Sequence, residues 1–375
     1  MQPNWQTREQ HLLASYATFS VAPASSRRYP EPPHAYRGPF QRDRDRVLHS
    51  AAFRRLSGKM QVFTGDMGDY HRTRLTHTNE VASVARTIAR QLRLNEDLVE
   101  ALALLHDVGH PPYGHCGEDA LQGCLRQHGG FSHNDFALRL VETIERRHTA
   151  TPGLNLSAAV LAGQRHRTIK NLALEVPSLE VQVVDAADSI AYDAHDVDDA
   201  LQVGLLQLED LRRLPFVARA LEEQGRRRGV VEPSRQFLVH AMIETQVHHF
   251  LEHVQPLLES CEGMTAEAVR EQRVELQMPS AVEREREELE AYLFANVYRH
   301  PRLVAVRDRA AQRLNQLFHL LEAYSERLPD RFVEMAVLEG VPRAVGTYLA
   351  GMTDRFCDET YTHLVEMGRP RAADW

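Results

Sequence analysis

The fold of this chain is decided at residues 105–115, which read LHDVGHPPYGH. Gly109 and the pair Pro111-Pro112 end a predicted helix there, so His106 and Asp107 are expected in its final turn. Side chains at a helix end project past the packed cylinder, and such positions suit ligand binding. The helix itself is indicated by apolar residues at three-to-four spacing, namely Leu98, Ala101, Leu102 and Leu105.

Two further predicted helices with the same period flank this stretch. The first follows His77, and its apolar stripe consists of Val81, Val84, Ala85, Ile88 and Leu92. The second covers residues 181–199, and its buried side consists of Val184, Ala187, Ile190, Ala191 and Ala194. Beside it, one neighbouring stripe of polar residues predicts the wall of a pocket: Asp188, Tyr192, His195 and Asp196. Because few segments alternate apolar and polar residues, the predicted fold class is mostly α.

Composition places the chain among ordinary globular proteins. It has 375 residues, of which 43% are hydrophobic and 26% charged. No apolar run approaches the ~20 residues of a membrane span, and the N-terminus lacks a basic-then-apolar signal pattern. The four cysteines form no CxxC pair, so a reducing cytoplasm is expected. The net charge of −8 argues against a whole-molecule attraction to nucleic acid.

Four residues form a candidate metal-binding set: His77, His106, Asp107 and Asp188. Two imidazoles and two carboxylates suit Mn²⁺, Fe²⁺, Mg²⁺, Zn²⁺ or similar ions. The alternative interpretation of the 105–115 cluster is a polar loop with capping residues.

His110, His115 and Glu118 are the candidates for chemistry beside this set. His110 and His115 are expected to face the substrate, because the glycines and prolines around them fix the loop. His115 and Glu118 stand at i, i+3 and share one face if the segment is helical. The carboxylate can then hold the imidazole in one tautomer, which suits acid–base or nucleophilic work on a phosphate ester.

The order of these residues resembles the HD superfamily of metal-dependent phosphohydrolases, and longer strings narrow the resemblance. From about Arg42 to the C-terminus the chain is similar to the dGTPase-like family of deoxynucleoside triphosphate (dNTP) triphosphohydrolases. The strings that carry this are Arg54-Arg55-Leu56, Gln61-Val62-Phe63, Arg72-Thr73-Arg74-Leu75-Thr76-His77, Pro112-Tyr113-Gly114-His115, Gly129-Gly130-Phe131-Ser132-His133-Asn134, Asp188-Ser189-Ile190-Ala191-Tyr192, Val297-Tyr298-Arg299-His300-Pro301 and Ala350-Gly351-Met352-Thr353-Asp354-Arg355.

This resemblance implies hydrolysis of dNTPs to deoxynucleoside and intact triphosphate. It makes the four candidate residues ligands of a divalent ion, Mn²⁺ or Mg²⁺ first, with Fe²⁺, Zn²⁺, Ni²⁺ or Co²⁺ as alternatives. Roles near the phosphates fall to Arg74 as a direct contact and to His110, His115 and His133 as lining, with His115 oriented by Glu118. Near the sugar, the resemblance implies that Gln61 contacts the 3′-hydroxyl and that Asp196 contacts the sugar. It also implies that Tyr192 lies against the deoxyribose, where its ring excludes a 2′-hydroxyl.

The proline content and the resemblance together give an expected domain organisation. Residues 1–41, rich in proline, are expected to form an extended N-terminal arm, and residues 42–375 an HD-type domain. Its HD core covers about 70–200, and additional helices form a C-terminal region over about 205–375. Homo-oligomers are frequent in the family, and the arm and charged C-terminal helices are compatible with one.

One position departs from the family. Glu290 stands where a lysine facing phosphate is expected. Either Arg286, one turn earlier, takes over this contact, or the phosphate clamp differs.

Other functions remain alternatives. One is a different HD phosphohydrolase, such as a nucleotidase or phosphodiesterase. Another is a nucleotide-sensing or nucleic-acid-binding protein with weak catalysis. The sequence leaves open the preferred base, the metal, the group that activates water, and whether a nucleotide activator binds.

Overall fold

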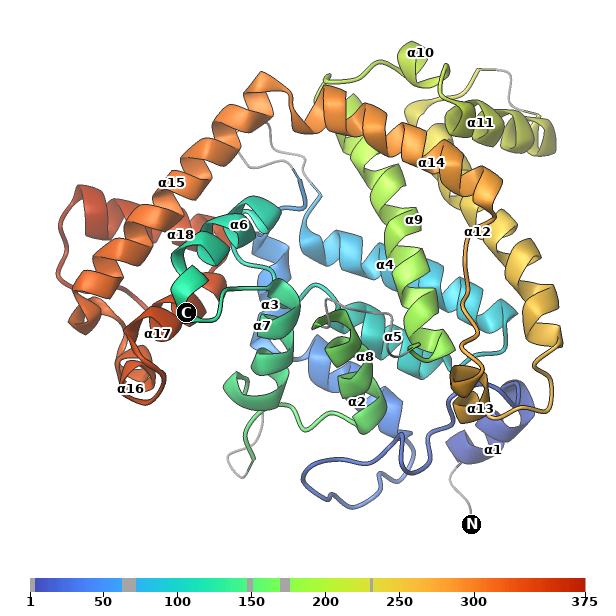
Figure 1. Ribbon diagram of the computed structural model, residues 1–375, viewed down its shortest axis with the longest axis horizontal. Coiled ribbons are helices and arrows are strands. Elements are labelled where there is room, and N and C mark those ends of the chain that lie inside the picture. Colours follow the sequence, from blue (N-terminus) through green and yellow to red (C-terminus); the bar gives the residue numbers. More distant parts are fainter. Residues whose placement is uncertain (1–3, 63–71, 147–150, 169–175, 230–231, 375) are drawn as a thin grey trace. The chain divides into compact units, whose positions relative to one another are not determined.

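The computed structural model describes residues 4–62, 72–146, 151–168, 176–229 and 232–374 (Figure 1). Within these ranges regular structure is helical, and β pairing is limited to the isolated bridges Arg27↔Ser157, Met60↔Thr73 and Arg146↔Gly153. The mostly α prediction, with helices continuing to the C-terminal region, is therefore confirmed. The chain forms two compact units, each assembled from three segments of the sequence.

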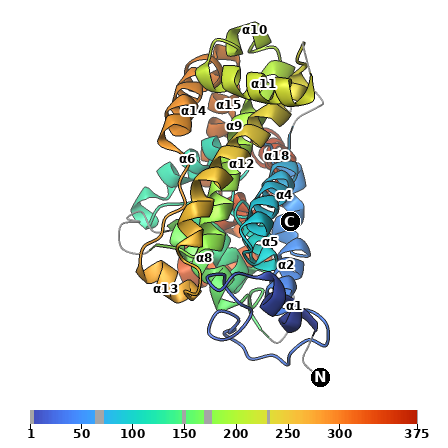
Figure 2. The ribbon, with the colours of Figure 1, turned by 90° about the vertical axis from the view of Figure 1, so that its right-hand side faces the viewer.

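The first unit consists of Met1–Val47, His77–Leu104 and Asn155–His300. Within it α12 (Arg235–Glu259) lies alongside α9 (Leu179–Gln202), as Figures 1 and 2 both show. Helix α11 (Pro215–Arg228) packs on α12, and α14 (Ser280–Leu293) contacts both α9 and α11. Helices α4 and α5 also contribute residues to the second unit. The helices of this unit are α1 (Asn4–Leu12), α2 (Pro39–Leu48), α4 (Arg74–Gln91), α5 (Glu96–Leu105), α8 (Ala158–Thr168), α9 (Leu179–Gln202), α10 (Leu208–Leu211), α11 (Pro215–Arg228), α12 (Arg235–Glu259), α13 (Ala266–Glu271), α14 (Ser280–Leu293) and the π-helix η5 (Phe294–Tyr298).

The second unit consists of Leu48–Thr76, Leu105–Leu154 and Pro301–Trp375. Here α15 runs along α6 (Figure 1) and also packs on α17, which in turn packs on α16. Its helices are α3 (Ala51–Arg55), η1 (Leu56–Gly58), α6 (Gly114–Cys124), η3 (Arg126–His128), α7 (His133–Arg139), the π-helix η4 (Leu140–Ile144), α15 (Pro301–Ala323), η6 (Ser325–Arg327), α16 (Asp330–Glu339), α17 (Val341–Ala350), α18 (Asp354–Tyr361) and the π-helix η7 (Thr362–Glu366).

Helix α9 is the element that the sequence pattern describes best. It begins where the Ser178 side chain accepts a hydrogen bond from the backbone of Val181, which satisfies one of the free amides of the first turn. The five apolar residues predicted for its buried side all have 0% exposure. The prediction of a buried stripe is therefore confirmed, and it holds the polar stripe with Asp188 in place.

The N-terminal segment is only partly extended. Residues 4–12 form α1, because this stretch has no proline to interrupt a helix. The following residues, where the prolines gather, run as turns and bends around the isolated bridge at Arg27. Glu31 anchors this part by accepting hydrogen bonds from Arg42, Arg46 and Asn155. The division into an arm of 1–41 and a domain of 42–375 stays a prediction. Among the described helices, none has the length and hydropathy needed to cross a membrane.

Candidate metal centre and active site

The turn after α5 presents the His106-Asp107 pair. Helix α5 ends at Leu105, and bonds from Val108 N to Leu105 O and from His110 N to Asp107 O then tighten the chain into turns. The pair thus lies directly after the helix rather than in its final turn, because three-residue turns replace helical bonding before Gly109.

Gly109 permits this turn to approach α7. A Cβ at position 109 would lie 1.9 Å from the carbonyl oxygen of His133 and 2.5 Å from the backbone nitrogen of Ala137. Such distances are far below van der Waals contact, so a side chain would force the backbones apart. Glycine therefore brings the His133 backbone against the loop that carries His110.

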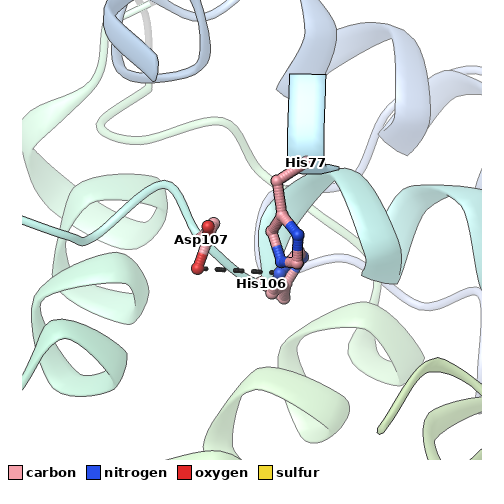
Figure 3. Close-up of side chains that lie close together, drawn as sticks. All are labelled: His77, His106 and Asp107. Carbon is pink, nitrogen blue, oxygen red and sulfur yellow. Dashed lines mark ion pairs between the residues drawn. The ribbon is translucent and has the colours of Figure 1, made fainter. Parts of the chain in front are cut away.

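Three predicted metal ligands form one buried group. His77, His106 and Asp107 each offer one ligand atom, and these atoms all lie within 4.8 Å of one another (Figure 3). The exposures of the three residues are 1%, 3% and 4%. In Figure 3 the dashed line joins His106 Nε2 to Asp107 Oδ1 at 3.6 Å. Two imidazole nitrogens and a carboxylate oxygen, withdrawn from water, make a donor set that fits a divalent transition-metal ion.

Asp188 stands next to this group through His77. Its Oδ1 lies 3.0 Å from His77 Nε2. Asp188 is not counted in the three-residue group, but the structure places it against a member of that group. Its assignment as the fourth ligand remains a proposal.

Arg74 neutralises Asp107 from the first residue of α4. Its Nη1 donates to Asp107 Oδ2 at 3.0 Å. Burial acts to raise the pKa of Asp107, but the charge of Arg74, with the neighbouring His106 and the hydrogen bond from His110, outweighs it and holds the pKa well below its usual range. Asp107 is therefore a carboxylate at neutral pH, the form that binds metal.

Two further nitrogens of Arg74, Nε and Nη2, are buried and have no hydrogen-bond partner among the described residues. A Cβ on Gly114 would lie 2.8 Å from Nη2, so the guanidinium lies against the first residue of α6. Helix α6 has no side-chain cap at this end. Unsatisfied buried donors beside the positive end of a helix fit an anion such as a phosphate.

Glu118 brings two other predicted catalytic residues, His115 and His133, together. It accepts hydrogen bonds from His133 Nδ1 at 2.8 Å and from His115 Nδ1 at 3.3 Å. It also accepts one from the backbone nitrogen of His133 at 2.9 Å. Burial acts to raise the pKa of Glu118, but the hydrogen bonds from both histidines dominate and lower it strongly. Glu118 is thus an ionised acceptor shared by two imidazoles, and the His115 side chain remains 61% exposed.

His110 completes the cluster. Its ring stacks on that of His133, with centroids 3.9 Å apart and planes 15° apart. Its Nε2 lies 3.1 Å from Asp107 Oδ1, and its buried Nδ1 has no partner in the described parts of the chain. Burial, with the charge of Arg74, lowers the pKa of His110 well below its usual value, so the imidazole is neutral.

The His110, Glu118 and His133 side chains also lie close enough to be considered for a metal. Imidazole lone pairs lie in the ring plane, and two stacked parallel rings cannot aim them at one ion. Glu118 is already engaged by three donors. This cluster is therefore better suited to hydrogen bonding than to metal binding.

The predicted sugar contacts have different surroundings. Gln61 follows the Met60↔Thr73 bridge, and its buried Oε1 has no partner within the described ranges. Phe63, from the same string, lies outside the described residues. The Tyr192 hydroxyl accepts a hydrogen bond from the Tyr298 hydroxyl at 2.8 Å, which fixes its ring. Asp196 is fully buried on α9, and its predicted sugar contact remains untested.

Arg286 is held by acidic side chains rather than free for phosphate. Its guanidinium contacts Asp193 at 2.8 Å, Glu283 at 2.8 Å and Glu290 at 3.4 Å. Burial raises the pKa of Asp193 to about 6, although Arg286 opposes this rise. Glu290 stands where a lysine facing phosphate is expected. Because Arg286 is engaged by these carboxylates, the arrangement favours a different phosphate clamp over a phosphate contact by Arg286.

Two residues that support the site were not assigned from the sequence. Lys59, fully buried, donates from Nζ to the carbonyl oxygens of His110 and Ala350. Asp354 accepts from the backbone nitrogens of Met60 at 3.0 Å and Tyr113 at 2.9 Å. Asp354 belongs to the sequence motif 350–355, which supports the family resemblance, but no sequence pattern near it indicates that it contacts Met60 and Tyr113.

Comparisons with known proteins agree with this geometry. The model of the HD domain matches residues 74–193, which contain His77, His106, Asp107 and Asp188, and that of the phosphohydrolase-associated domain matches residues 276–363. A protein of Bordetella pertussis is 40% identical over 374 residues, covering 95% of this chain and 97% of its own. One from Syntrophus aciditrophicus is 40% identical, with 96% of each chain covered. A third, from Leptospira interrogans, is 37% identical, with 95% and 97% covered. All three are named deoxyguanosinetriphosphate triphosphohydrolase-like protein.

Proposed function

Because the chain belongs to the deoxyguanosinetriphosphate triphosphohydrolase-like family of HD-domain proteins, we propose that it hydrolyses dNTPs with the aid of a divalent metal ion. Water attacks the α-phosphorus, the bond to the 5′ oxygen breaks, and the products are deoxynucleoside and inorganic triphosphate. The observation that carries this proposal is the buried group of His77, His106 and the ionised Asp107, with Arg74 beside it.

His77, His106, Asp107 and Asp188 would hold the ion, for which we propose Mn²⁺ or Mg²⁺. When bound, such an ion polarises phosphoryl oxygens and makes water more acidic. The burial of three of these residues supports this role, because a charge held out of bulk water acts strongly on its neighbours.

Arg74 would bind the phosphates. Its two unpartnered nitrogens and the uncapped first turn of α6 can donate to phosphate oxygens. The neutral His110 would line the same region, with its buried Nδ1 available to a substrate atom.

His115 would deliver a proton to the leaving 5′ oxygen. It is the most exposed member of its cluster and is therefore reachable by substrate. Glu118 would orient its imidazole while also holding His133. General acids of this kind contribute about 10²–10⁴-fold to a rate.

Gln61, Tyr192 and Asp196 are proposed to recognise the deoxyribose. The unpartnered Oε1 of Gln61 can accept a hydrogen bond from the 3′-hydroxyl. The Tyr192 ring, held by Tyr298, would exclude a 2′-hydroxyl by steric penalty. The Asp196 contact is carried over from the family resemblance alone.

The test is incubation with each dNTP and with GTP, in Mn²⁺ or Mg²⁺, followed by chromatography of the products. Deoxynucleoside and triphosphate in equal amounts are expected, with GTP a poor substrate. Release of phosphate or diphosphate would indicate another HD phosphohydrolase, and binding without turnover a nucleotide sensor. The homo-oligomer, the cytoplasmic location and a nucleotide activator stay predictions, and nucleic-acid binding remains open.

A further inference from the structure

We propose that the Tyr113 hydroxyl positions His115 for the reaction, because its hydrogen bond to Asp358 holds the turn from which α6 begins. This inference rests on the proposed function, in which His115 is the general acid. Tyr113 Oη donates to Asp358 Oδ1 at 2.7 Å. The backbone nitrogen of Tyr113 donates to Asp354 Oδ1 at 2.9 Å, so α18 holds this residue at two points. All four residues belong to the second unit.

The backbone at Tyr113 has a conformation that bulky residues rarely adopt. Its φ and ψ angles are 63° and 20°, in the left-handed region, and Gly114 follows with a φ of 60°. Glycine accepts this region readily, whereas a tyrosine stays there only when its surroundings hold it. The two hydrogen bonds to α18 supply that hold.

Helix α18 presents both acceptors on one face. Asp354 and Asp358 are four residues apart in the helix, so their side chains are neighbours. Helix α15 packs against both α6 and α18. From α15, Arg313 Nη1 donates to Asp358 Oδ1 at 2.6 Å, the same oxygen that accepts from Tyr113. Arg313 therefore orients the carboxylate that binds the Tyr113 hydroxyl.

The position of His115 depends on this turn. His115 is the second residue of α6, and its side chain is 61% exposed. Its 3.3 Å contact with Glu118 lies within α6, so that contact fixes the ring to the helix and leaves the direction of the helix to the turn. Gly114 lies against Arg74, since a Cβ there would be 2.8 Å from Nη2. A relaxed turn would shift His115 relative to Arg74, and a displacement of about 1 Å can lower a rate about 10²-fold.

The experiment measures kcat, KM and bound metal for the full-length chain with dGTP and Mn²⁺. Tyr113→Phe removes only the hydroxyl, and Asp358 keeps Arg313 as a partner, so the variant should fold. It should lower kcat by roughly 10- to 100-fold, while KM and metal content stay as in wild type. Tyr361→Phe is the matched control, because it removes a hydroxyl of the same helix that donates to Gln316 at 2.6 Å. It should leave kcat unchanged.

Further variants separate positioning from a general loss of packing. Asp358→Asn keeps the oxygen that accepts the hydroxyl and should retain most of kcat, whereas Asp358→Ala should lose as much as Tyr113→Phe. The double variant of Tyr113→Phe and Asp358→Ala should be no slower than either single variant, because both remove the same bond. In a His115→Ala background, Tyr113→Phe should lower kcat no further. Wild-type kcat in Tyr113→Phe, or losses that multiply in either double variant, would overturn the proposal.

Hydrogen exchange tests the turn without turnover. Peptides covering residues 112–118 should exchange faster in Tyr113→Phe than in wild type, because the Tyr113 amide is bonded to Asp354 within the held turn. Tyr361→Phe should exchange as wild type does. Equal exchange in Tyr113→Phe and wild type would show that the hydroxyl does not hold the turn, and would overturn the proposal. A wild type that leaves dNTPs intact, with faster exchange in Tyr113→Phe, would overturn the proposed function alone.

Discussion

Asp107 differs from Asp188 in what surrounds it, and the difference predicts different consequences of mutation. The Asp107 side chain is 6% exposed and balances Arg74, whereas that of Asp188 is 34% exposed. Asp107→Ala and Asp188→Ala should both lose most bound metal and nearly all turnover. Asp107→Ala should also lower the free energy of unfolding by about 3 kcal/mol or more, because Arg74 would be buried without a counter-charge.

Metal content after dialysis and urea unfolding of the metal-free proteins measure these two effects. Asp119→Ala, an exposed carboxylate of α6, is the control and should change neither. Near-wild-type metal content in both variants would show that the ligand assignment is wrong.

His115 is the residue whose chemistry can be separated from metal binding. His115→Ala should lower kcat by about 10²-fold or more, since a general acid would be lost, while metal content stays normal. Nucleotide affinity should change little, because Arg74 is untouched. His128→Ala, another exposed histidine in the second unit, should leave kcat unchanged. Normal kcat in His115→Ala would move the acid–base role to His110 or His133.

The turn after α5 depends on one glycine that packs against α7. Gly109→Ala should destabilise the protein by about 1–3 kcal/mol and reduce activity, because its Cβ would meet the His133 and Ala137 backbones. Gly123→Ala on α6 is the matched substitution, where a Cβ would meet nothing within 4 Å. It should stabilise by about 0.5–1 kcal/mol, since alanine favours a helix. Equal unfolding free energies for the two variants would contradict this packing argument.

The N-terminal segment should make stability depend on pH. Burial acts to raise the pKa of Glu31, but hydrogen bonds from Arg46 and Asn155 and the charges of Arg46 and Arg42 lower it to about 2. A depressed carboxyl pKa stabilises the fold above the unfolded value of about 4.3, and this contribution is lost as pH falls toward 2.

Glu31→Gln should therefore be less stable than wild type at pH 7, and the difference should shrink between about pH 4.3 and pH 2. Urea unfolding across this range measures it, with Glu209→Gln at an exposed site as the control. A difference that stays constant with pH would show that the ion pairs of Glu31 do not stabilise the fold.

Contacts within one helix were predictable from the sequence, whereas contacts between distant segments were not. The buried side of α9 and the His115–Glu118 contact follow from spacing alone, because a helix repeats every 3.6 residues. The shorter contact, from His133 to Glu118, joins residues 15 positions apart. Lys59 reaches Ala350 across 291 positions, and Asp354 reaches Tyr113 across 241. No local pattern encodes such pairs, since they depend on how elements pack.

At the scale of the whole molecule, the net negative charge opposes the binding of a negatively charged substrate. The chain carries a net charge of −8, so it repels a triphosphate at long range. Capture must therefore rely on local positive groups. One guanidinium nitrogen of Arg74 is already hydrogen-bonded to Asp107, and Arg286 forms ion pairs with three carboxylates. A bound cation would therefore add positive charge that the proposed reaction can use.

Metal removal should then abolish activity and lower the stability of the chain together. After chelation and buffer exchange, the protein should hydrolyse dGTP at background rates, and Mn²⁺ should restore turnover. The melting temperature should rise with Mn²⁺ concentration, because an ion that binds only the folded state stabilises it by RT ln(1 + [L]/Kd). Asp188→Ala is the control, in which neither turnover nor melting temperature should respond to Mn²⁺. Full turnover with metal far below one ion per chain would contradict a metal-dependent reaction, whatever the products.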